Sequence, residues 1–536
     1  MKHWNKIQYK LTNQYHINSI YPNNSMSNPI NQSSPKNGKS ESQSIYAQYR
    51  CYWDLAAPFI KTETGNTWSY GEMDKITASM SRKLISSGLG IGDRLFCLIE
   101  RSPWNLFLYL SCLRAGIVYI PFNPEAKEGE LAPVIADIKP HAFICSSNAE
   151  ALLKKLLPNT QSHTLETDGS GTINSIIEIE TEADLAVTPH DIASIIFTSG
   201  TTGRPKGAMM PHGLFSFKGK ALSDAMGWSK TDCLLHVMPL HHAHGLFMAF
   251  HTVLASGASI LLQNKFIAQE TVNLLIQCTV FSGVPTMYSR MLECQNLKEV
   301  SAKIRLFVAA SAALPPDIFH KFKALTNHEI AEGWGMSETT SNSMSPLTGI
   351  RKAGSAGIPL PGIDIKIINP SGETLGVNEV GQLALRLPIH FKGYWQRPQE
   401  EQPQYLNGFQ VTHDLGRFDE DGYLFISGRL SDVIISGGYN IYPREVEGVI
   451  EKLNYVEKAV VFGIPHKEFG EAVVVALKSI AGNTIDNEHL LSHLKEHFAS
   501  YKIPKAIFIL DEFPLTELGK VQRGALFEKY KTHFTN

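Results

Sequence analysis

Short apolar runs alternate with segments of helical spacing through the first third of the chain. Arg94–Ile99, Val118–Phe122 and His141–Cys145 are apolar and short, which is typical of buried strands. Trp104–Leu113 and Gly129–Ile138 lie between them and carry apolar residues at helical spacing. This order predicts an α/β fold with parallel sheets covered by helices.

The same alternation resumes after residue 207. We expect strands at Cys233–Leu240, Thr279–Ser282 and Arg305–Ala310, and helices at Leu246–Leu254 and Asp317–Leu325. Ligands of parallel sheets bind beyond the carboxyl ends of the strands. Polar residues that follow these strands are therefore candidate site residues.

The pattern changes from about Gly354, where glycines and prolines separate short β segments such as Ile363–Ile368 and Gly381–Arg386. These predict a small antiparallel β subdomain. Further apolar runs, at Ala459–Phe462 and Val473–Leu477, predict that the last part of the chain has a core of its own.

Three regions follow from these patterns. Residues 1–44 are rich in Asn and Ser and are expected to form a disordered leader. Residues 45–429 are expected to form a large N-terminal domain of layered α/β sheets with the β subdomain, although the polar stretch 160–190 should be irregular. Residues 430–536 are expected to form a small α+β C-terminal domain.

Composition narrows the function. A length of 536 residues is too great for one core, and 43% hydrophobic with 19% charged residues is typical of a soluble globular protein. The net charge of -2 argues against a nucleic-acid partner. Seven cysteines without a C-x-x-C pair indicate reduced thiols and a cytoplasmic protein. We see neither a secretory signal nor an apolar run suited to integral membrane association.

A run rich in glycine and hydroxyl residues follows the apolar residues Ile195–Phe197. Its members are Thr198, Ser199, Gly200, Thr201, Thr202, Gly203 and Lys206. Glycines let backbone N–H groups approach an anion, and the lysine adds a positive charge. The order differs from a Walker loop, because Pro205 precedes the lysine and Gly207 follows it. The run predicts a polyphosphate cradle, with a surface turn as the alternative.

This run, TSGTTGRPKG, closely resembles the phosphate loop of the adenylate-forming superfamily, which includes acyl-CoA synthetases, adenylation domains of peptide synthetases and firefly luciferase. Gly333–Glu338, Thr412–Gly416 and Pro514–Lys520 resemble three more of its signatures, in the family order. The resemblance covers 45–536. It implies an enzyme that uses ATP, Mg²⁺ and coenzyme A, with a mobile C-terminal domain.

The resemblance also implies roles for single residues around ATP. Those at the nucleotide are Ser311, Trp334, Gly335, Asp414 and Arg429, with Trp334 against adenine and Asp414 on the ribose hydroxyls. Ser337 would donate to the α-phosphate, and Glu338 would hold Mg²⁺, a cation that prefers oxygen ligands. His413 stands where the family has glycine, and a left-handed position there would strain it.

Two elements of the C-terminal part would act in turn. Lys520 would reach the substrate carboxylate and the α-phosphate during adenylation. Gly437 and Gly438 would then swing in about a hinge at Ser431 and shape the channel for the pantetheine arm. Ser431 replaces the usual Lys or Asp of the family.

Within the superfamily, the chain is most similar to malonyl-CoA synthetases. The arginine matched by Arg290 pairs there with the distal carboxylate of malonate, and His242 and His244 line the acyl pocket. A zinc site at these histidines is disfavoured, since no cysteine or acid lies at ligand spacing. The expected reaction is malonate, or methylmalonate, to its CoA thioester.

Other functions stay open. A short- or medium-chain fatty acyl-CoA or aryl-CoA synthetase is one alternative, and a stand-alone adenylating enzyme that loads a carrier protein is another. No residue in the sequence requires the oxygen chemistry of a luciferase-type oxygenase. A binding protein without activity is disfavoured because Glu338, Asp414, Arg429 and Lys520 occur together. The sequence does not predict the oligomeric state.

Overall fold

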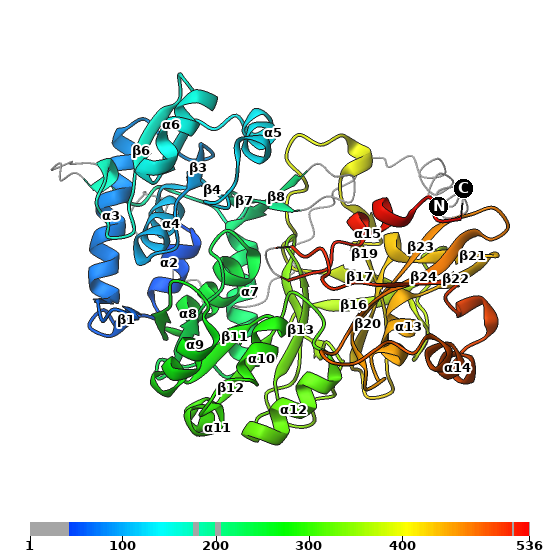
Figure 1. Cartoon of the computed structure of the whole chain (residues 1–536). Helices are drawn as coiled ribbons and strands as arrows, with labels where there is room; N and C mark the ends of the chain where they lie inside the picture. Colours follow the sequence, from blue (N-terminus) through cyan, green and yellow to red (C-terminus); the bar gives the residue numbers. More distant parts are fainter. Residues whose placement is uncertain (1–41, 175–181, 199–204, 517–518, 535–536) are drawn as a thin grey trace.

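The structure, a computed structural model, describes residues 42–174, 182–198, 205–516 and 519–534 (Figure 1). These residues form four β-sheets with helices packed against them. The expected leader lies outside the described ranges apart from residues 42–44. Within those ranges, no helix is both long and apolar enough to span a membrane.

A six-stranded sheet near the N-terminus carries the glycine-rich run at one end. Its strands, in spatial order, are β6 (Gln161–Thr164), β5 (Ala142–Cys145), β3 (Arg94–Leu98), β4 (Val118–Pro121), β7 (Ile192–Thr198) and β8 (Lys206–Pro211). Strands β6 to β7 are parallel, and β8 returns antiparallel to β7 with Lys206 paired to Thr198. The two ends of the glycine-rich run therefore meet at the end of this hairpin.

A nine-stranded sheet forms the second layer, shown in green in Figure 1 apart from its blue first strands. Its spatial order is β15 (Ile358–Pro359), β14 (Thr340–Met344), β13 (Ala331–Met336), β12 (Leu306–Ala309), β11 (Val280–Gly283), β9 (Cys233–His236), β10 (Ser259–Leu262), β1 (Pro58–Thr62) and β2 (Thr67–Ser69). The strands from β13 to β1 are parallel. Their carboxyl ends meet at one edge, as expected for a ligand site.

Helix α4 (Pro103–Ala115) follows β3 in the chain and packs in the core that the two sheets share. It begins at Ser102, whose hydroxyl accepts the N–H of Asn105, and it ends at Gly116, where φ is 66°. A helix that is apolar on all sides is expected to be buried. Its side chains belong to a core cluster that includes strands from both sheets. Further helices of this part are α2 (Ile45–Arg50), α3 (Tyr70–Ser86), α5 (Glu128–Ile138), α6 (Ser147–Leu156), α7 (His212–Ala225), α8 (His251–Ser256), α9 (Ala268–Leu274), α10 (Pro285–Met291), α11 (Leu297–Val300) and α12 (Pro316–Thr326).

The expected β subdomain is an antiparallel five-stranded sheet. It consists of β16 (Asp364–Ile368), β17 (Gly381–Arg386), β19 (Phe409–Phe418), β18 (Gln404–Leu406) and β20 (Leu424–Arg429). Strand β20 ends at Arg429, and the turn η6 (Leu430–Asp432) leads from it into the C-terminal unit, by which we mean the chain after Arg429.

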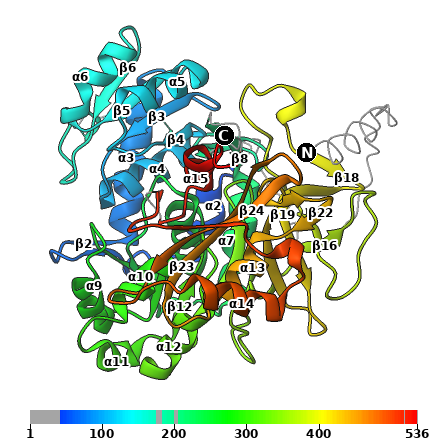
Figure 2. The same cartoon turned by 45° about the vertical axis from the view of Figure 1, so that its right-hand side comes forward.

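The C-terminal unit has one sheet and its own apolar clusters on both faces. Its elements are β22 (Tyr439–Ile441), β21 (Ile434–Ser436), β24 (Gly470–Ser479), β23 (Val456–His466), β25 (Ala506–Ile509), α13 (Pro443–Ile450), α14 (Asn487–His497) and α15 (Arg523–Tyr530). Figure 2 turns this orange and red unit forward, with α14 at its lower edge. The α/β layers with a separate C-terminal part are confirmed, whereas the boundary after Arg429 stays a prediction.

Two local expectations differ from the structure. The stretch 160–190 is not irregular throughout, because Gln161–Thr164 forms β6. This is an edge strand with its first two residues only partly buried, so no apolar run marks it in the sequence. The helix expected at Leu246–Leu254 is present, but its first part is a π-helix, η2 (His244–Phe250), which continues into α8.

Candidate active site

The described ends of the glycine-rich run lie beside an acidic and an aromatic residue. Lys206 Nζ is 2.8 Å from Glu401 Oε2 and 5.5 Å from the centre of the Tyr394 ring. Arg397 Nη2 donates to the carbonyl of Pro205 at 2.8 Å and to Asp137 at 2.9 Å, which fixes the far end of the run. The predicted residues Ser199, Gly200, Thr201, Thr202 and Gly203 lie outside the described residues.

Tyr394 links the β7–β8 hairpin to Glu338, in the second family signature. Its hydroxyl donates to Glu338 Oε1 at 2.7 Å, and its backbone forms an antiparallel bridge with Ala208 in β8. Burial, reinforced by the Glu338 carboxylate, raises the pKa of Tyr394. Tyr394 was not among the residues predicted from the sequence, although the run of one glycine and two aromatics at 393–395 could have indicated it.

Glu338 and Ser337 lie in the turn between β13 and β14. This turn requires glycine at position 335, because a Cβ there would lie 2.1 Å from the carbonyl oxygen of Thr340. Ser337 and Glu338 are both partly exposed. A hydroxyl and a carboxylate therefore stand at the carboxyl end of β13, where the sheet topology places a ligand.

The predicted nucleotide residues Trp334, Asp414 and Arg429 are brought together. Trp334 Nε1 donates to Asp414 Oδ2 at 2.8 Å, and Arg429 Nε lies 3.5 Å from Asp414 Oδ1. Trp334 is 7% exposed and Asp414 is 9% exposed. The hydrogen bond joins the nine-stranded and five-stranded sheets, and the sequence analysis did not foresee it. His413, next to Asp414, has no positive φ, so the strain considered for that position does not arise.

His244, the first residue of η2, is buried against the edge of the nine-stranded sheet. Its Nδ1 lies 3.1 Å from Ser311 Oγ, and its Nε2 lies 2.8 Å from Ser282 Oγ. Burial, with smaller contributions from His242 and Lys520, lowers the pKa of His244 to about 3. The imidazole is therefore neutral at physiological pH. Ser282 was also missed, although it is a polar residue at the carboxyl end of a predicted strand.

Ser282 also borders a small apolar cavity beside the site. The cavity measures about 20 Å³ and is lined by Leu222, Met248, Val308 and Met344, among others. This volume accommodates about one water-sized group. A long acyl chain would need these side chains to move apart.

The end of the C-terminal unit reaches this edge. A Cβ on Gly519 would lie 3.1 Å from the side chain of Thr286, in the first turn of α10. Lys520 keeps contact with solvent, yet the protein around it lowers its pKa, first through desolvation and then through the charge of Arg429, while Asp414 opposes the shift. The charges of Arg429 and Asp414 therefore both act on Lys520.

The other predicted element of the C-terminal unit lies elsewhere. Gly437 and Gly438, with φ of 57° and 85°, form the turn between β21 and β22, as two-residue hairpins require. Both are exposed, and the N–H of Gly437 donates to the carbonyl of Phe469 within the same unit.

Two of the residues predicted to bind the acid, His242 and Arg290, are not buried. His242 lies just before η2, with its ring 4.4 Å from that of His241. Arg290 is exposed on α10, and it pairs with no acidic group among the described residues. It lies one helical turn after Thr286 and so faces the same side of the helix as the residue that touches Gly519.

Comparisons with known proteins agree with this geometry. The family described as AMP-binding enzyme matches residues 48–395, and the AMP-binding enzyme C-terminal domain matches residues 445–520. A malonate–CoA ligase of Arabidopsis thaliana is 34% identical over 522 residues, covering 86% of this chain and 84% of the relative. A long-chain-fatty-acid–CoA ligase of Bacillus subtilis is 31% identical over 490 residues, covering 83% and 86%.

A solved structure has the same architecture. ATP-bound MatB from Rhodopseudomonas palustris superposes with a TM-score of 0.88 at 33% identity, covering 92% of this chain and 100% of that one. These matches span both parts of the chain and include the loop, turn and lysine described above. The chain therefore belongs to the AMP-binding enzyme family and is an ATP-dependent acid–CoA ligase of the adenylate-forming type.

Proposed function

We propose that the acid is malonate and that the product is malonyl-CoA. The observation that carries this proposal is the position of Arg290, one turn of α10 beyond the residue that contacts Gly519. A guanidinium at this place suits a second carboxylate on the substrate, because arginine binds carboxylates in a bidentate manner. The small cavity behind Ser282 and the similarity to a malonate–CoA ligase support a short acid.

In the first half-reaction, a carboxylate oxygen of malonate attacks the α-phosphorus of ATP. The new O–P bond forms as the bond between the α-phosphorus and the oxygen that bridges to the β-phosphate breaks. The products are malonyl-adenylate and pyrophosphate. We assign Lys206 and its loop to the β- and γ-phosphates, and Ser337 and Lys520 to the charge that develops at the α-phosphate. Asp414 and Arg429 would hold the ribose, with Trp334 and Gly335 against adenine and Ser311 nearby.

Glu338 is the residue that we assign to Mg²⁺. The ion commonly binds through one or two carboxylates together with substrate phosphates, and it neutralises phosphate charge. A single carboxylate beside the phosphate loop fits this donor set. The bond from Tyr394 engages Oε1 of Glu338 and leaves Oε2 for the ion.

In the second half-reaction, the thiol of coenzyme A attacks the acyl carbon of the adenylate, and AMP leaves. We take the described arrangement, in which the charge of Asp414 acts on Lys520 and the glycine hairpin is exposed, to be the adenylating state. We propose that rotation about Ser431 withdraws Lys520 and brings Gly437 and Gly438 to the site, beside His242. His244 would stay neutral and shape the acyl pocket.

A panel of acids tests the substrate. Thioester formation is measured with malonate, methylmalonate, acetate, octanoate and a benzoate, for the full chain and for Arg290→Ala. Loss of a charge-assisted hydrogen bond of about 1.5–3 kcal/mol should lower kcat/KM for malonate about 10- to 100-fold, with little effect on acetate. Lys298→Ala, on the exposed side of α11, is the matched control.

Each alternative predicts another result. A fatty acyl- or aryl-CoA synthetase would prefer octanoate or benzoate and would be indifferent to Arg290→Ala. An enzyme that loads a carrier protein would release pyrophosphate without forming any CoA thioester. A kcat/KM for malonate that is unchanged in Arg290→Ala would refute the assignment.

A further inference from the structure

Helix α14 carries a pattern of metal-binding residues that the ligase reaction does not use. The run from His493 to His497 reads H-x-x-E-H, with Glu496 as its acid. Residues three and four apart lie on one face of a helix. Two histidines one turn apart on a helix bind zinc in several metalloproteins, where the glutamate between them acts as a base.

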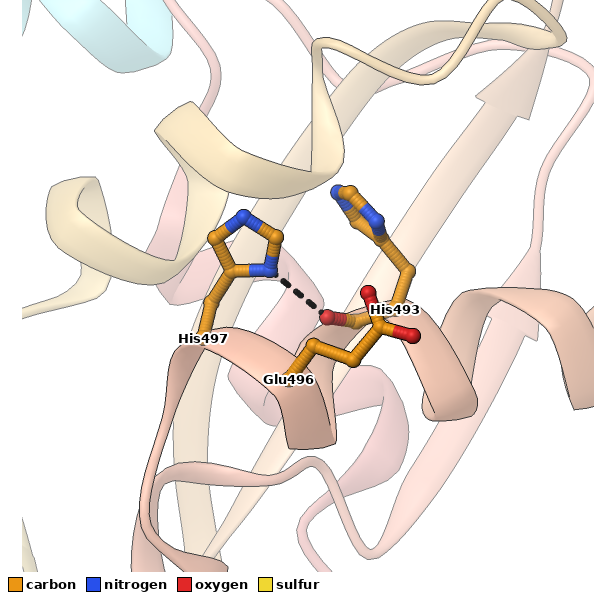
Figure 3. A group of neighbouring side chains, drawn as sticks. All are labelled: His493, Glu496 and His497. Carbon is orange, nitrogen blue, oxygen red and sulfur yellow. Dashed lines mark hydrogen bonds between the residues drawn. The ribbon is translucent and has the colours of Figure 1, made fainter.

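The three side chains already converge. One potential ligand atom of each of His493, Glu496 and His497 lies within 4.8 Å of the other two. Figure 3 shows both imidazole rings on the same side of α14, with the carboxylate of Glu496 near His493. The ring centres are 4.5 Å apart. Ligand atoms about 2.0–2.2 Å from a shared ion lie closer to one another than 4.8 Å, so side-chain rotations would bring these three into coordination.

The hydrogen bond of His497 leaves its Nε2 as the nitrogen that would be available to a metal. Its Nδ1 lies 2.8 Å from the carbonyl oxygen of His493, drawn as the dashed line in Figure 3. A carbonyl only accepts, so Nδ1 carries the proton and Nε2 keeps its lone pair. Histidine ligands of metals are commonly oriented in this way, through a bond from the second nitrogen to a carbonyl.

His493 supplies an independent observation. Its Nε2 is buried and has no hydrogen-bond partner within the described part of the chain. Buried polar atoms are nearly always paired, so an unpaired one calls for an explanation such as an ion. His489, one turn earlier, differs, because its Nδ1 is 3.0 Å from the hydroxyl of Tyr455.

We propose that His493, Glu496 and His497 form a binding site for a divalent transition metal, with Zn²⁺ as the best match. Two imidazoles and one carboxylate suit zinc, and also copper or nickel, whereas Mg²⁺ and Ca²⁺ prefer oxygen ligands alone. The site is therefore chemically distinct from the one proposed at Glu338. Leu490 and Leu494 anchor α14 in the core, so bound metal would stabilise the C-terminal unit.

The test is a titration of the full chain, freed of metal by a chelator, with Zn²⁺ in competition with a chromogenic zinc indicator. We expect saturable binding of one ion per chain, unaffected by excess Mg²⁺. The double variant His493→Ala/His497→Ala should lose this binding, and Glu496→Gln should weaken it. Co²⁺ in place of zinc should give visible absorption bands that disappear in the double variant.

His489→Ala is the matched control, since it removes a histidine from the same helix and leaves the three ligands intact. It should bind zinc as the unaltered chain does. The double variant should keep its circular dichroism and its pyrophosphate exchange rate, which shows that it folds. Zinc binding that persists in the double variant, or no saturable binding by the unaltered chain, would overturn the proposal.

Discussion

Replacing Trp334 by phenylalanine tests the nucleotide site through one hydrogen bond. The change keeps an aromatic ring but removes the N–H that donates to Asp414 Oδ2 at 2.8 Å. Both residues are nearly buried, so water cannot replace the lost donor easily. Among the described side chains, only Arg429 would then contact the Asp414 carboxylate, at the longer distance of 3.5 Å.

The magnitude follows from the charge on the acceptor. Hydrogen bonds to a charged group are worth about 1.5–3 kcal/mol, and each 1.4 kcal/mol is about a tenfold change in an equilibrium constant. If Asp414 binds the ribose hydroxyls only when it is correctly oriented, the KM for ATP should rise about 10- to 100-fold. The KM for the acid should change little.

Trp53→Phe is a suitable control. Trp53 is also 7% exposed, and its Nε1 donates to the carbonyl of Leu254 at 2.9 Å, away from the site. Both variants lose the same atoms from a buried position, and therefore both should be less stable. Only Trp334→Phe should alter the KM for ATP.

The assay is ATP–pyrophosphate exchange, performed with ATP and with 2′-deoxy-ATP. The unaltered enzyme should discriminate between the two nucleotides, since Asp414 is expected to accept the 2′-hydroxyl. Trp334→Phe should reduce this discrimination as well as raise the KM. A KM for ATP within twofold of the original, or an equal rise in Trp53→Phe, would refute the reasoning.

Three further substitutions have distinct expected results. Lys206→Ala should slow adenylate formation far more than thioester formation from supplied malonyl-adenylate, measured as separate half-reactions; equal losses would contradict its assignment to the departing phosphates. Lys520→Ala should likewise affect only the first half-reaction, because this lysine is withdrawn for the second, and a comparable loss in thioester formation would count against the rotation. Glu332→Gln should change the pH dependence of stability: burial raises the pKa of Glu332 to about 8, so the folded chain retains a proton that the unfolded chain loses near its ordinary pKa of 4.5. The free energy of unfolding should therefore decrease by about 1.4 kcal/mol per pH unit between these values, and denaturant titrations of Glu332→Gln should lack this decrease.

The sequence predicted best where local pattern and burial agree. The strands β3, β4 and β5 lie inside a parallel sheet, are buried along nearly their whole length and read as apolar runs. Strand β6 lies at the edge of the same sheet, consists of Gln, Ser, His and Thr, and was missed. Edge strands need no apolar run, so their pattern does not distinguish them from loops.

The sequence predicted which residues belong to the candidate site, but it did not predict the contacts between them. Trp334 and Asp414 are 80 positions apart, and Tyr394 and Glu338 are 56 apart. Neither pair follows from periodicity, because each joins different sheets or a loop to a sheet. Arg290 shows the opposite limit. The resemblance to malonyl-CoA synthetases implied a buried partner for a carboxylate, whereas the fold leaves Arg290 on an exposed helix face.

The ion pair between Lys206 and Glu401 gives the phosphate loop an internal counter-ion. When pyrophosphate leaves a cationic site, the positive charge of the site loses its counter-ion. This loss costs free energy and slows product release. With Glu401 Oε2 2.8 Å from the ammonium, a carboxylate is at hand to replace the departing oxygens. On the proposed assignment of Lys206 to the phosphates, the same carboxylate would compete with incoming ATP, so the pair would weaken substrate and product binding together and favour turnover over affinity. Glu401→Gln should accordingly make pyrophosphate a stronger product inhibitor, and unchanged inhibition would show that this exchange of anions does not occur.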